Sequence, residues 1–425
     1  MTTNPGRSVS MTSFFVLWSG QALSILGSLA VQFGLIWWLT QETGSAAVLA
    51  TATLLALLPM VALGPVIGVL VDRWDRKHVM LAADGLVALA SLALAYLFFI
   101  GGATVGVVLL SLFFRGLGSA FHSPAMLAST SLMVPGEHLT RIQGLNQMLQ
   151  GGANIVSAPL GALLMSSLPM TGVMLVDVVT ALFAMIPLCF IHVPRPTRAA
   201  VAAIEAAGSI WTEMVAGARY LAARRGHMSL LFMAALINMC LVPAFSLLPL
   251  FVSAELDGDA LQLGRITSVF GIGTIVGGII LGIWGGTRRR ILTVLPALIC
   301  LGVAVVGLGM APSITIAAVS MLLVGLIVPF ANGPIQAIFQ ATVLADYQGR
   351  VFTLMGSLSG AAAPLGLLLA APITEMVGVS SWYMAGGLVC LAMGILGFFL
   401  PSLMRIEQSP SGEPAAPPGE RWESL

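Results

Sequence analysis

The chain has 425 residues, of which 58% are hydrophobic and 8% charged, and its formal net charge is +1. Ordinary soluble domains carry about 25% charged residues, so this composition excludes a water-soluble surface and indicates a polytopic membrane protein. Its few basic residues are scattered, which excludes a basic stripe that could neutralise nucleic-acid phosphates.

Twelve apolar stretches follow one another along the chain, each long enough to cross a bilayer as a helix. The predicted spans are 14–39, 47–70, 79–100, 104–132, 143–167, 172–192, 228–253, 263–284, 291–310, 313–340, 350–372 and 382–402. Segment 193–227 interrupts them, is rich in Ala and Arg, and predicts a linker with a short amphipathic helix on the membrane surface.

The spans predict an all-α polytopic membrane protein with two six-helix pseudo-symmetric bundles. Its predicted parts are an N-terminal cytoplasmic tail (1–13), a first bundle (14–192), the linker (193–227), a second bundle (228–404) and a disordered cytoplasmic tail (405–425). Basic residues gather in the loops of one side, which the positive-inside rule assigns to the cytoplasm. We therefore expect a multi-pass protein of the plasma (inner) membrane with both termini in the cytoplasm.

The two halves repeat each other. A glutamine and glycine, 13 further residues and APLG occur at 143–161 and again at 348–366, which is 205 residues later. GLGSAFHSPA, from residue 116, matches GLIVPFANGPI, from residue 325, at an offset of 209. Such a duplication predicts two bundles that face one central site and rock about it; the alternative is a duplicated scaffold with no transport role.

Polar side chains recur on single faces of three predicted spans, at helical spacing. Such stripes are typical of a water-accessible substrate path, and interhelical hydrogen bonding is the alternative. The predicted substrate-cavity residues are Gln21, Ser28, Gln32, His122, Gln143, Asn146, Gln147, Gln150, Asn154, Asn238, Asn332, Gln336 and Gln340.

Ionisable groups inside the spans are fewer. Arg115 lies near the middle of span four, where an unpaired charge costs at least ~2.5 kcal/mol. Asp84 in span three and Asp177 in span six could each pair with a cation or carry a proton. These three residues are the predicted proton-coupling or buried-charge group, and a fixed structural ion pair is the alternative for each carboxylate.

Motifs of catalysis and cofactor binding are missing from the sequence. The four cysteines form no CxxC pair, and the sole lysine, Lys77, is followed by His78, which excludes a phosphate-binding loop of the GKS or GKT type. HExxH and GxSxG are missing as well. We expect no enzyme, no metal and no cofactor.

Residues 12–405 resemble the major facilitator superfamily, which implies the twelve-span fold and alternating access. The loop GVLVDRWDRKHVM is similar to that family's motif between spans two and three, and the resemblance implies that Asp72 and Arg76 latch the cytoplasmic ends of the two halves together. The predicted latch residues are Gly64, Gly68, Asp72, Arg73 and Arg76. A solvated turn is the alternative.

Two further motifs resemble those of exporters. Arg115 with Gly118 is similar to the span-four motif of proton-coupled drug exporters, and span five partly matches an antiporter motif. The predicted hinge or packing residues are Gly152, Pro159, Gly161, Pro364 and Gly366. AFHSPA, LVDRWDRK and VPFANGPIQAIFQ look most like the macrolide efflux subgroup, which also resembles enterobactin exporters.

These observations predict a secondary active exporter that moves an amphiphilic, macrolide-type molecule in exchange for protons. Export of a siderophore or lipid-like molecule, and a membrane receptor without transport activity, are the alternatives. The expected partners are membrane lipid, the substrate and the proton, with no nucleic acid; the oligomeric state stays open, with a monomer expected.

Overall fold

The computed structural model describes residues 11–134, 138–191, 219, 221–222, 224–343 and 345–407, and all regular secondary structure among them is helical. Within these residues, twelve helices are long and apolar enough to cross a membrane. The first half contains α1 (Met11–Thr43), α2 (Ala46–Arg73), α3 (Arg76–Phe99), α4 (Val105–Met133), α5 (Leu139–Ser167) and α6 (Met170–Phe190). The predicted all-helical, twelve-span fold class is confirmed.

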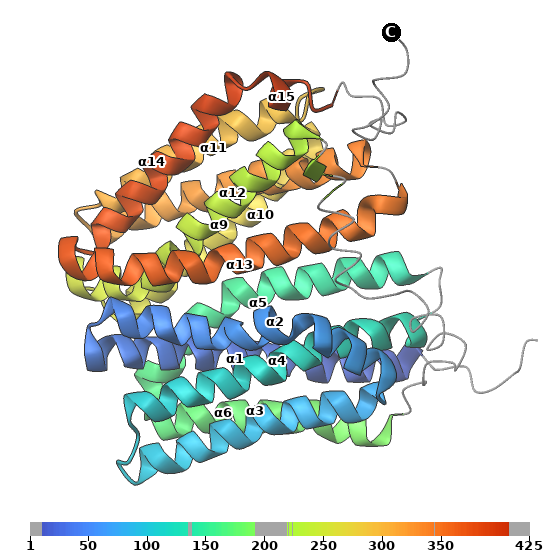
Figure 1. The fold of residues 1–425 in the computed structure, drawn as a ribbon. Coiled ribbons are helices and arrows are strands. Elements are labelled where there is room, and N and C mark those ends of the chain that lie inside the picture. Colours follow the sequence, from blue (N-terminus) through green and yellow to red (C-terminus); the bar gives the residue numbers. More distant parts are fainter. Residues whose placement is uncertain are drawn as a thin grey trace, which may run out of the picture.

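The second half repeats this arrangement beside the first (Figure 1). It contains α9 (Arg225–Leu250), α10 (Ala260–Trp284), α11 (Ile291–Gly309), α12 (Ile314–Thr342), α13 (Ala345–Val377) and α14 (Val379–Phe398). The π-turn η2 (Phe251–Glu255) continues α9, and the short helix α15 (Pro401–Met404) follows α14.

Two predicted boundaries differ from the structure. Helix α9 begins at Arg225, inside the segment predicted as linker, and most of that segment lies outside the described residues. Residues 405–407 belong to the folded part and not to a tail, because Ile406 is 2% exposed and Glu407 Oε2 accepts a hydrogen bond from Ile291 N at 3.3 Å. The apolar side chain of Ile406 anchors this segment, which a prediction based on the Pro-rich composition could not detect.

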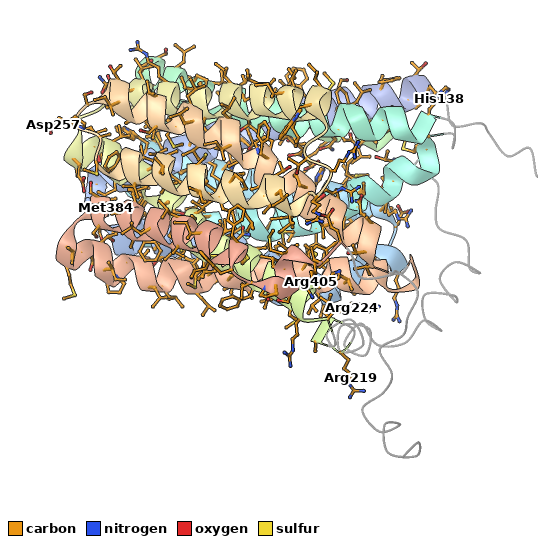
Figure 2. The ribbon with its side chains drawn as sticks, turned by 90° about the horizontal axis from the view of Figure 1, so that it is seen from above. His138, Arg219, Arg224, Asp257, Met384 and Arg405 are labelled. Atoms are coloured by element: carbon orange, nitrogen blue, oxygen red, sulfur yellow. The ribbon has the colours of Figure 1, made fainter. Side chains whose placement is uncertain are left out.

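The bundle has a basic end and an acidic end. His138, Arg219, Arg224 and Arg405 lie at one end, opposite Asp257 and Met384 (Figure 2). We call the first the basic end; the helix directions also place there Arg73, Arg76, Lys77 and Arg288–Arg290. We call the other the acidic end; it holds Glu42, Glu255, Asp257, Asp259 and Glu375.

Equivalent glycines bring helices into close contact within each half. A Cβ on Gly161 of α5 would lie 2.5 Å from the carbonyl oxygen of Ala30 in α1. A Cβ on Gly366 of α13 would lie 2.0 Å from the carbonyl oxygen of Met239 in α9. By contrast, a Cβ on Gly152 would meet no atom within 4 Å. Two glycines 205 residues apart therefore occupy matching packing positions.

Substitution of these glycines is expected to affect stability unequally. Gly161→Ala and Gly366→Ala force a methyl group against a backbone carbonyl, so we expect each to lower the free energy of unfolding by about 1–3 kcal/mol. Gly152→Ala serves as the matched control and is expected to unfold like the wild type. Thermal unfolding of the purified variants in detergent measures the effect; equal unfolding temperatures for all three would contradict the described packing.

One face of α10 joins the two halves. A Cβ on Gly264 would lie 3.2 Å from the Cβ of Ala162 in α5, and a Cβ on Gly271 would lie 2.2 Å from Ile155 Cγ1. Gly278 follows seven residues later on the same face of α10, and a Cβ there would meet nothing within 4 Å. The seam between α5 and α10 is therefore packed toward the acidic end and unpacked toward the basic end.

The seam between α2 and α13 shows the same asymmetry. At the acidic end, Glu375 Oε1 accepts hydrogen bonds from Ser45 Oγ at 3.1 Å and from Ala47 N at 3.4 Å. Toward the basic end of α2, a Cβ on Gly64 or Gly68 would meet nothing within 4 Å. Both seams therefore hold the halves together at the acidic end.

Candidate functional site

Three helices of the first half carry polar residues at a spacing of seven. The pairs are Gln21 and Ser28 on α1, Asp84 and Ser91 on α3, and Arg115 and His122 on α4. Seven residues span nearly two helical turns, or about 10 Å along the axis, so the members of a pair share a face. The structure combines them into two polar layers, one above the other along the bundle.

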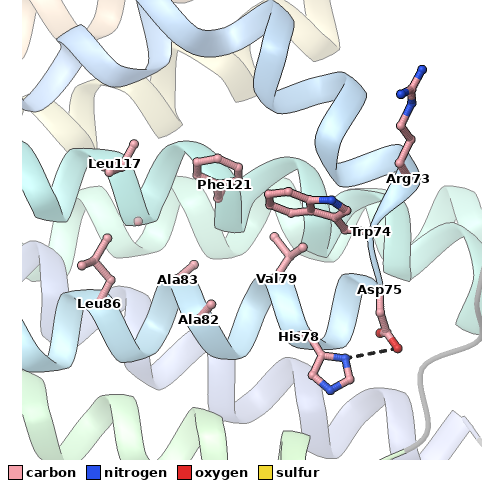
Figure 3. A pocket seen from close by; sticks show the side chains of 11 residues that line it. Arg73, Trp74, Asp75, His78, Val79, Ala82, Ala83, Leu86, Leu117 and Phe121 are labelled. Carbon is pink, nitrogen blue, oxygen red and sulfur yellow. Dashed lines mark ion pairs between the residues drawn. The ribbon is translucent and has the colours of Figure 1, made fainter.

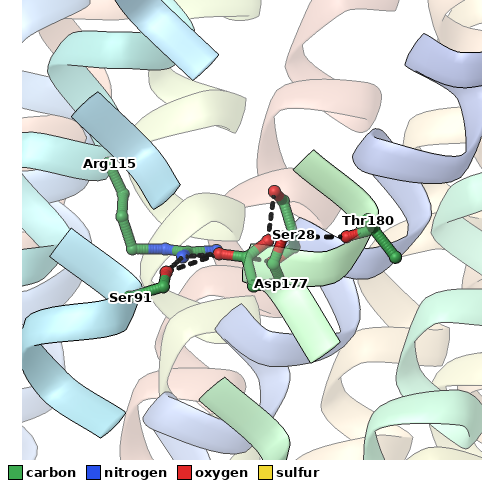
Figure 4. Close-up of polar contacts among 5 residues, drawn as sticks. All are labelled: Ser28, Ser91, Arg115, Asp177 and Thr180. Atoms are coloured by element: carbon green, nitrogen blue, oxygen red, sulfur yellow. Dashed lines mark hydrogen bonds and ion pairs between the residues drawn. The ribbon is translucent and has the colours of Figure 1, made fainter. Parts of the chain in front are cut away.

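The deep layer is a closed ion-pair network of Arg115, Asp177, Ser91 and Ser28 (Figure 4). Arg115 Nη1 forms an ion pair with Asp177 Oδ2 and donates to Ser91 Oγ at 2.6 Å, while its Nη2 donates to the carbonyl oxygen of Ser28 at 2.9 Å. Ser91 Oγ donates to Asp177 Oδ2 at 2.6 Å, and Ser28 Oγ donates to Oδ1 at 2.7 Å.

Burial makes this network energetically demanding. Arg115 is 7% exposed, and Asp177 and Ser91 are both fully buried. A buried charge is tolerated when a partner of opposite charge and further hydrogen bonds compensate its desolvation. Both charges of the deep layer are compensated within the layer itself, so of the two predicted carboxylates it is Asp177 that pairs with Arg115.

The shallow layer consists of Asp84, Gln21 and His122 and lies nearer the basic end. Gln21 Nε2 donates to Asp84 Oδ2 at 3.0 Å, and His122 Nε2 lies 3.5 Å from Asp84 Oδ1. Asp84 is 8% exposed and Gln21 is 1% exposed, yet Gln21 Oε1 has no hydrogen-bond partner among the described residues. Unlike the deep layer, this layer holds a buried carboxylate without an arginine or lysine partner in the described contacts.

A cavity of about 340 Å³ adjoins both layers. Its lining comes from α1 to α6 and includes the predicted residues Gln21, Ser28, Gln32, Asp84, Arg115, His122, Gln150 and Asn154. A second cavity, of about 240 Å³, shares Gln21, Ile25, His122, Ser123 and Gln150 with the first and continues toward the basic end past Trp18 and Asn146. The polar path therefore runs from the middle of the first half toward the basic end.

Several predicted cavity residues lie elsewhere. Asn238 of α9 donates from Nδ2 to the carbonyl oxygen of Ala234 at 2.9 Å, which is a bond within its own helix. Asn332, Gln336 and Gln340 of α12 are exposed, and none of them lines the two cavities of the first half. The side chains of Gln143 and Gln147 lie outside the described part of the chain.

Two residues of the candidate site, one in the deep layer and one in the second cavity, were not predicted. Ser91 supplies a hydroxyl to both charges of the deep layer, and Trp18 Nε1 donates to Asn146 Oδ1 at 2.8 Å, linking α1 to α5. The seven-residue spacing between Asp84 and Ser91 is the signal that could have identified Ser91. No comparable spacing pointed to Trp18.

A third cavity, of about 800 Å³, lies outside the polar path, between α3 and α4 at the end of α2 (Figure 3). Arg73, Trp74, Asp75 and His78 lie at its basic end, and the ring of Trp74 stacks on that of Phe121 with centroids 6.4 Å apart. Asp75 caps α3, since its side chain accepts from Lys77 N at 3.1 Å.

The predicted latch is only partly described. Arg76 Nη1 donates to the carbonyl oxygen of Ala128 in α4 at 3.0 Å, which ties the loop to its own half. Asp72 lies in the last turn of α2, and its side chain is outside the described part, so its pairing with Arg76 stays a prediction.

A family model described as the Major Facilitator Superfamily matches residues 17–367. The chain belongs to the major facilitator superfamily. This superfamily membership agrees with the twelve membrane-spanning helices, the two similar halves and the polar path between helices. It makes the chain a multi-pass membrane transporter and not an enzyme.

Relatives within the superfamily cover nearly the whole chain. It is 35% identical over 384 residues to macrolide efflux protein A of Streptococcus pyogenes, covering 89% of this chain and 94% of that protein. It is 26% identical over 385 residues to the multidrug efflux pump Tap of Mycolicibacterium fortuitum, covering 87% and 91%. These relatives support an efflux transporter and bear out the resemblance to the macrolide efflux subgroup.

Solved structures of the superfamily share the fold at low sequence identity. A crystal structure of a D-xylose-proton symporter matches with a TM-score of 0.71 and 13% identity, covering 92% of this chain and 98% of the symporter. At this level of sequence identity, the structural similarity shows only that the helices are arranged in the same way.

Proposed function

We propose that this protein exports an amphiphilic, macrolide-type molecule from the cytoplasm across the plasma membrane by alternating access, in exchange for protons. The observation that carries the proposal is the polar path of the first half, which continues toward the basic end while both seams are packed at the acidic end. The positive-inside rule puts the basic end and both termini in the cytoplasm, so the path is open to cytoplasmic substrate.

Alternating access requires a second packing of the same seams. The face of α10 that carries Gly264 and Gly271 continues to Gly278, which faces open space. A glycine here lets the basic halves of α5 and α10 approach when the acidic halves separate. The unpacked glycines of α2 support the same rocking motion at the other seam.

Proton exchange needs a carboxylate whose protonation can change. Asp177 is held by Arg115 and two hydroxyl donors, whereas Asp84 faces the Gln21 amide from α1 and the His122 imidazole from α4. A buried carboxylate without a strong cationic partner is neutralised at lower cost by a proton. Asp84 is therefore the proton carrier in this proposal, and Arg115 and Asp177 form a fixed pair.

Drug tolerance of an efflux-deficient bacterial host tests the proposal. Expression of the wild type is expected to raise the minimal inhibitory concentration of macrolides. Gly278→Leu is expected to remove this protection, because its side chain obstructs closure of the basic end and leaves the transporter in the described state. Gly106→Leu, at a glycine that also faces open space but lies at the acidic end of α4, is the matched control and should protect like the wild type.

Protein abundance in the membrane is measured for each variant. Unchanged susceptibility with wild-type protein present in the membrane would refute macrolide export. Full protection by Gly278→Leu would contradict closure along this face of α10.

A further inference from the structure

We propose that the shallow layer binds a protonated amine of the transported molecule, with Asp84 as counter-ion and Gln21 as a hydrogen-bond acceptor. This inference rests on the proposed function, because it names the substrate class that the cavity of that transporter selects. It assigns the selectivity for an amine to the shallow layer and none of it to the deep layer.

The two carboxylates of the first half differ in what compensates them. Both oxygens of Asp177 accept bonds from groups in the deep layer, and Arg115 neutralises its charge. The described contacts of Asp84 are one neutral amide and one imidazole nitrogen 3.5 Å away. His122 supplies a positive charge only when it is protonated, so beside a neutral imidazole an ionised Asp84 that is 8% exposed still needs a cation.

Gln21 supplies a second, independent indication. Its Nε2 donates to Asp84, which fixes the orientation of the amide, since its oxygen would be repelled by the carboxylate. Gln21 Oε1 is consequently a buried acceptor without a partner among the described residues, on a side chain that is 1% exposed. A buried acceptor left unsatisfied costs about 1–3 kcal/mol, so this position requires a donor.

A protonated amine satisfies both requirements at once. Its charge compensates Asp84, and its N–H can be donated to Gln21 Oε1. A water molecule could supply the donor but not the charge. A neutral polar group has the same deficiency, so this pair of acceptors selects an ammonium group over an uncharged one.

The surroundings suit the remainder of an amphiphile. Gln21 and His122 border both cavities, so the layer is reached from the path that leads to the basic end. Apolar side chains line the cavity of about 340 Å³ beside the shallow layer, including Ile25, Leu57, Met60, Val87 and Leu112. An amine attached to a large apolar body can thus bind its charge to Asp84 and bury its body against these residues.

Equilibrium binding to the purified transporter in detergent tests this inference, because it does not depend on coupled transport. Three radiolabelled ligands differ only at nitrogen: a macrolide with a dimethylamino sugar, its N-methyl quaternary salt, and its N-demethylated, N-acetylated neutral analogue. We expect the wild type to bind the tertiary amine roughly 10- to 100-fold more tightly than the neutral analogue. The quaternary salt, which keeps the charge but lacks an N–H, should bind with intermediate affinity.

Two variants separate the contributions. Asp84→Asn should lower the affinity for the tertiary amine by roughly 10- to 100-fold and leave that for the neutral analogue unchanged. Gln21→Leu should weaken the tertiary amine but not the quaternary salt, which makes no N–H bond. Asp259→Asn and Gln41→Leu remove the same groups at the acidic end and serve as matched controls, with thermal unfolding reporting the integrity of every variant.

The outcomes decide between the two proposals. Equal affinity of the wild type for amine and neutral analogue, no binding of the amine, or an equal loss for both ligands in Asp84→Asn would overturn the amine site. If Asp84→Asn fails to fold, the Gln21→Leu comparison decides alone, and equal effects on tertiary and quaternary ligands would count against the site. Selective amine binding without transport in vesicles would refute the proposed function and leave the site standing.

Discussion

Replacing Arg115 by alanine is expected to abolish efflux and to lower the free energy of unfolding by about 3–5 kcal/mol. The reason is Asp177, which is fully buried and, among the described residues, would retain the hydroxyl groups of Ser28 and Ser91 as its side-chain partners. A carboxylate without its cation pays most of its desolvation cost uncompensated. Thermal unfolding in detergent and drug susceptibility in the efflux-deficient host measure the two effects.

A double substitution distinguishes folding from function. Arg115→Met combined with Asp177→Leu removes both charges, so most of the lost stability should return. Efflux is expected to stay absent, since Arg115 also lines the polar cavity. If Arg115→Ala were as stable and as active as the wild type, the ion pair between Arg115 and Asp177 would be contradicted. Full efflux by the double variant would restrict Arg115 to a structural role.

Asp84→Asn is expected to abolish the release of protons that accompanies substrate binding. Wild-type protein in weakly buffered detergent solution should release about one proton for each substrate bound, because a cation and a proton compete for the same carboxylate. The variant should release none, even at substrate concentrations high enough to offset weaker binding. A pH indicator or a calorimetric titration in buffers of different ionisation enthalpy measures the number released.

Asp259→Asn is the control for this measurement. Asp259 caps α10 at the acidic end, where its Oδ1 accepts from Gln262 N at 2.7 Å, far along the chain from the polar path. If Asp84→Asn released as many protons as the wild type, the proton would have to come from another group. That result would refute the assignment of Asp84 as the proton carrier.

The fold could be predicted closely from the sequence, because the signal is physical and local. Each span must be about 20 apolar residues long, and several span ends are marked by charges or by helix caps such as Ser45 and Asp259. The folding of residues 405–407 against the bundle was not predicted, because the burial of this segment depends on contacts with helices more than a hundred residues away in sequence.

The candidate site could be predicted only in part. Spacing indicated that Gln21 and Ser28 share one face of α1, but it could not tell which helix that face meets. Two carboxylates were available for Arg115, and only the packing of α3, α4 and α6 shows that Asp177 is its partner. The amide of Asn238 illustrates the opposite limit, since a polar side chain in a helix can bond its own backbone and contribute to no site.

The central claim, export driven by proton exchange, is tested most directly with everted membrane vesicles, whose interior corresponds to the outside of the cell. With an imposed gradient, acidic inside, vesicles carrying the wild type should accumulate more labelled macrolide than vesicles without the transporter, which a basic amine enters by passive diffusion, and a proton conductor should abolish this excess. Vesicles carrying Asp84→Asn should show no excess. Accumulation that persists without a proton gradient, or its absence with correctly inserted wild-type protein, would contradict the claim.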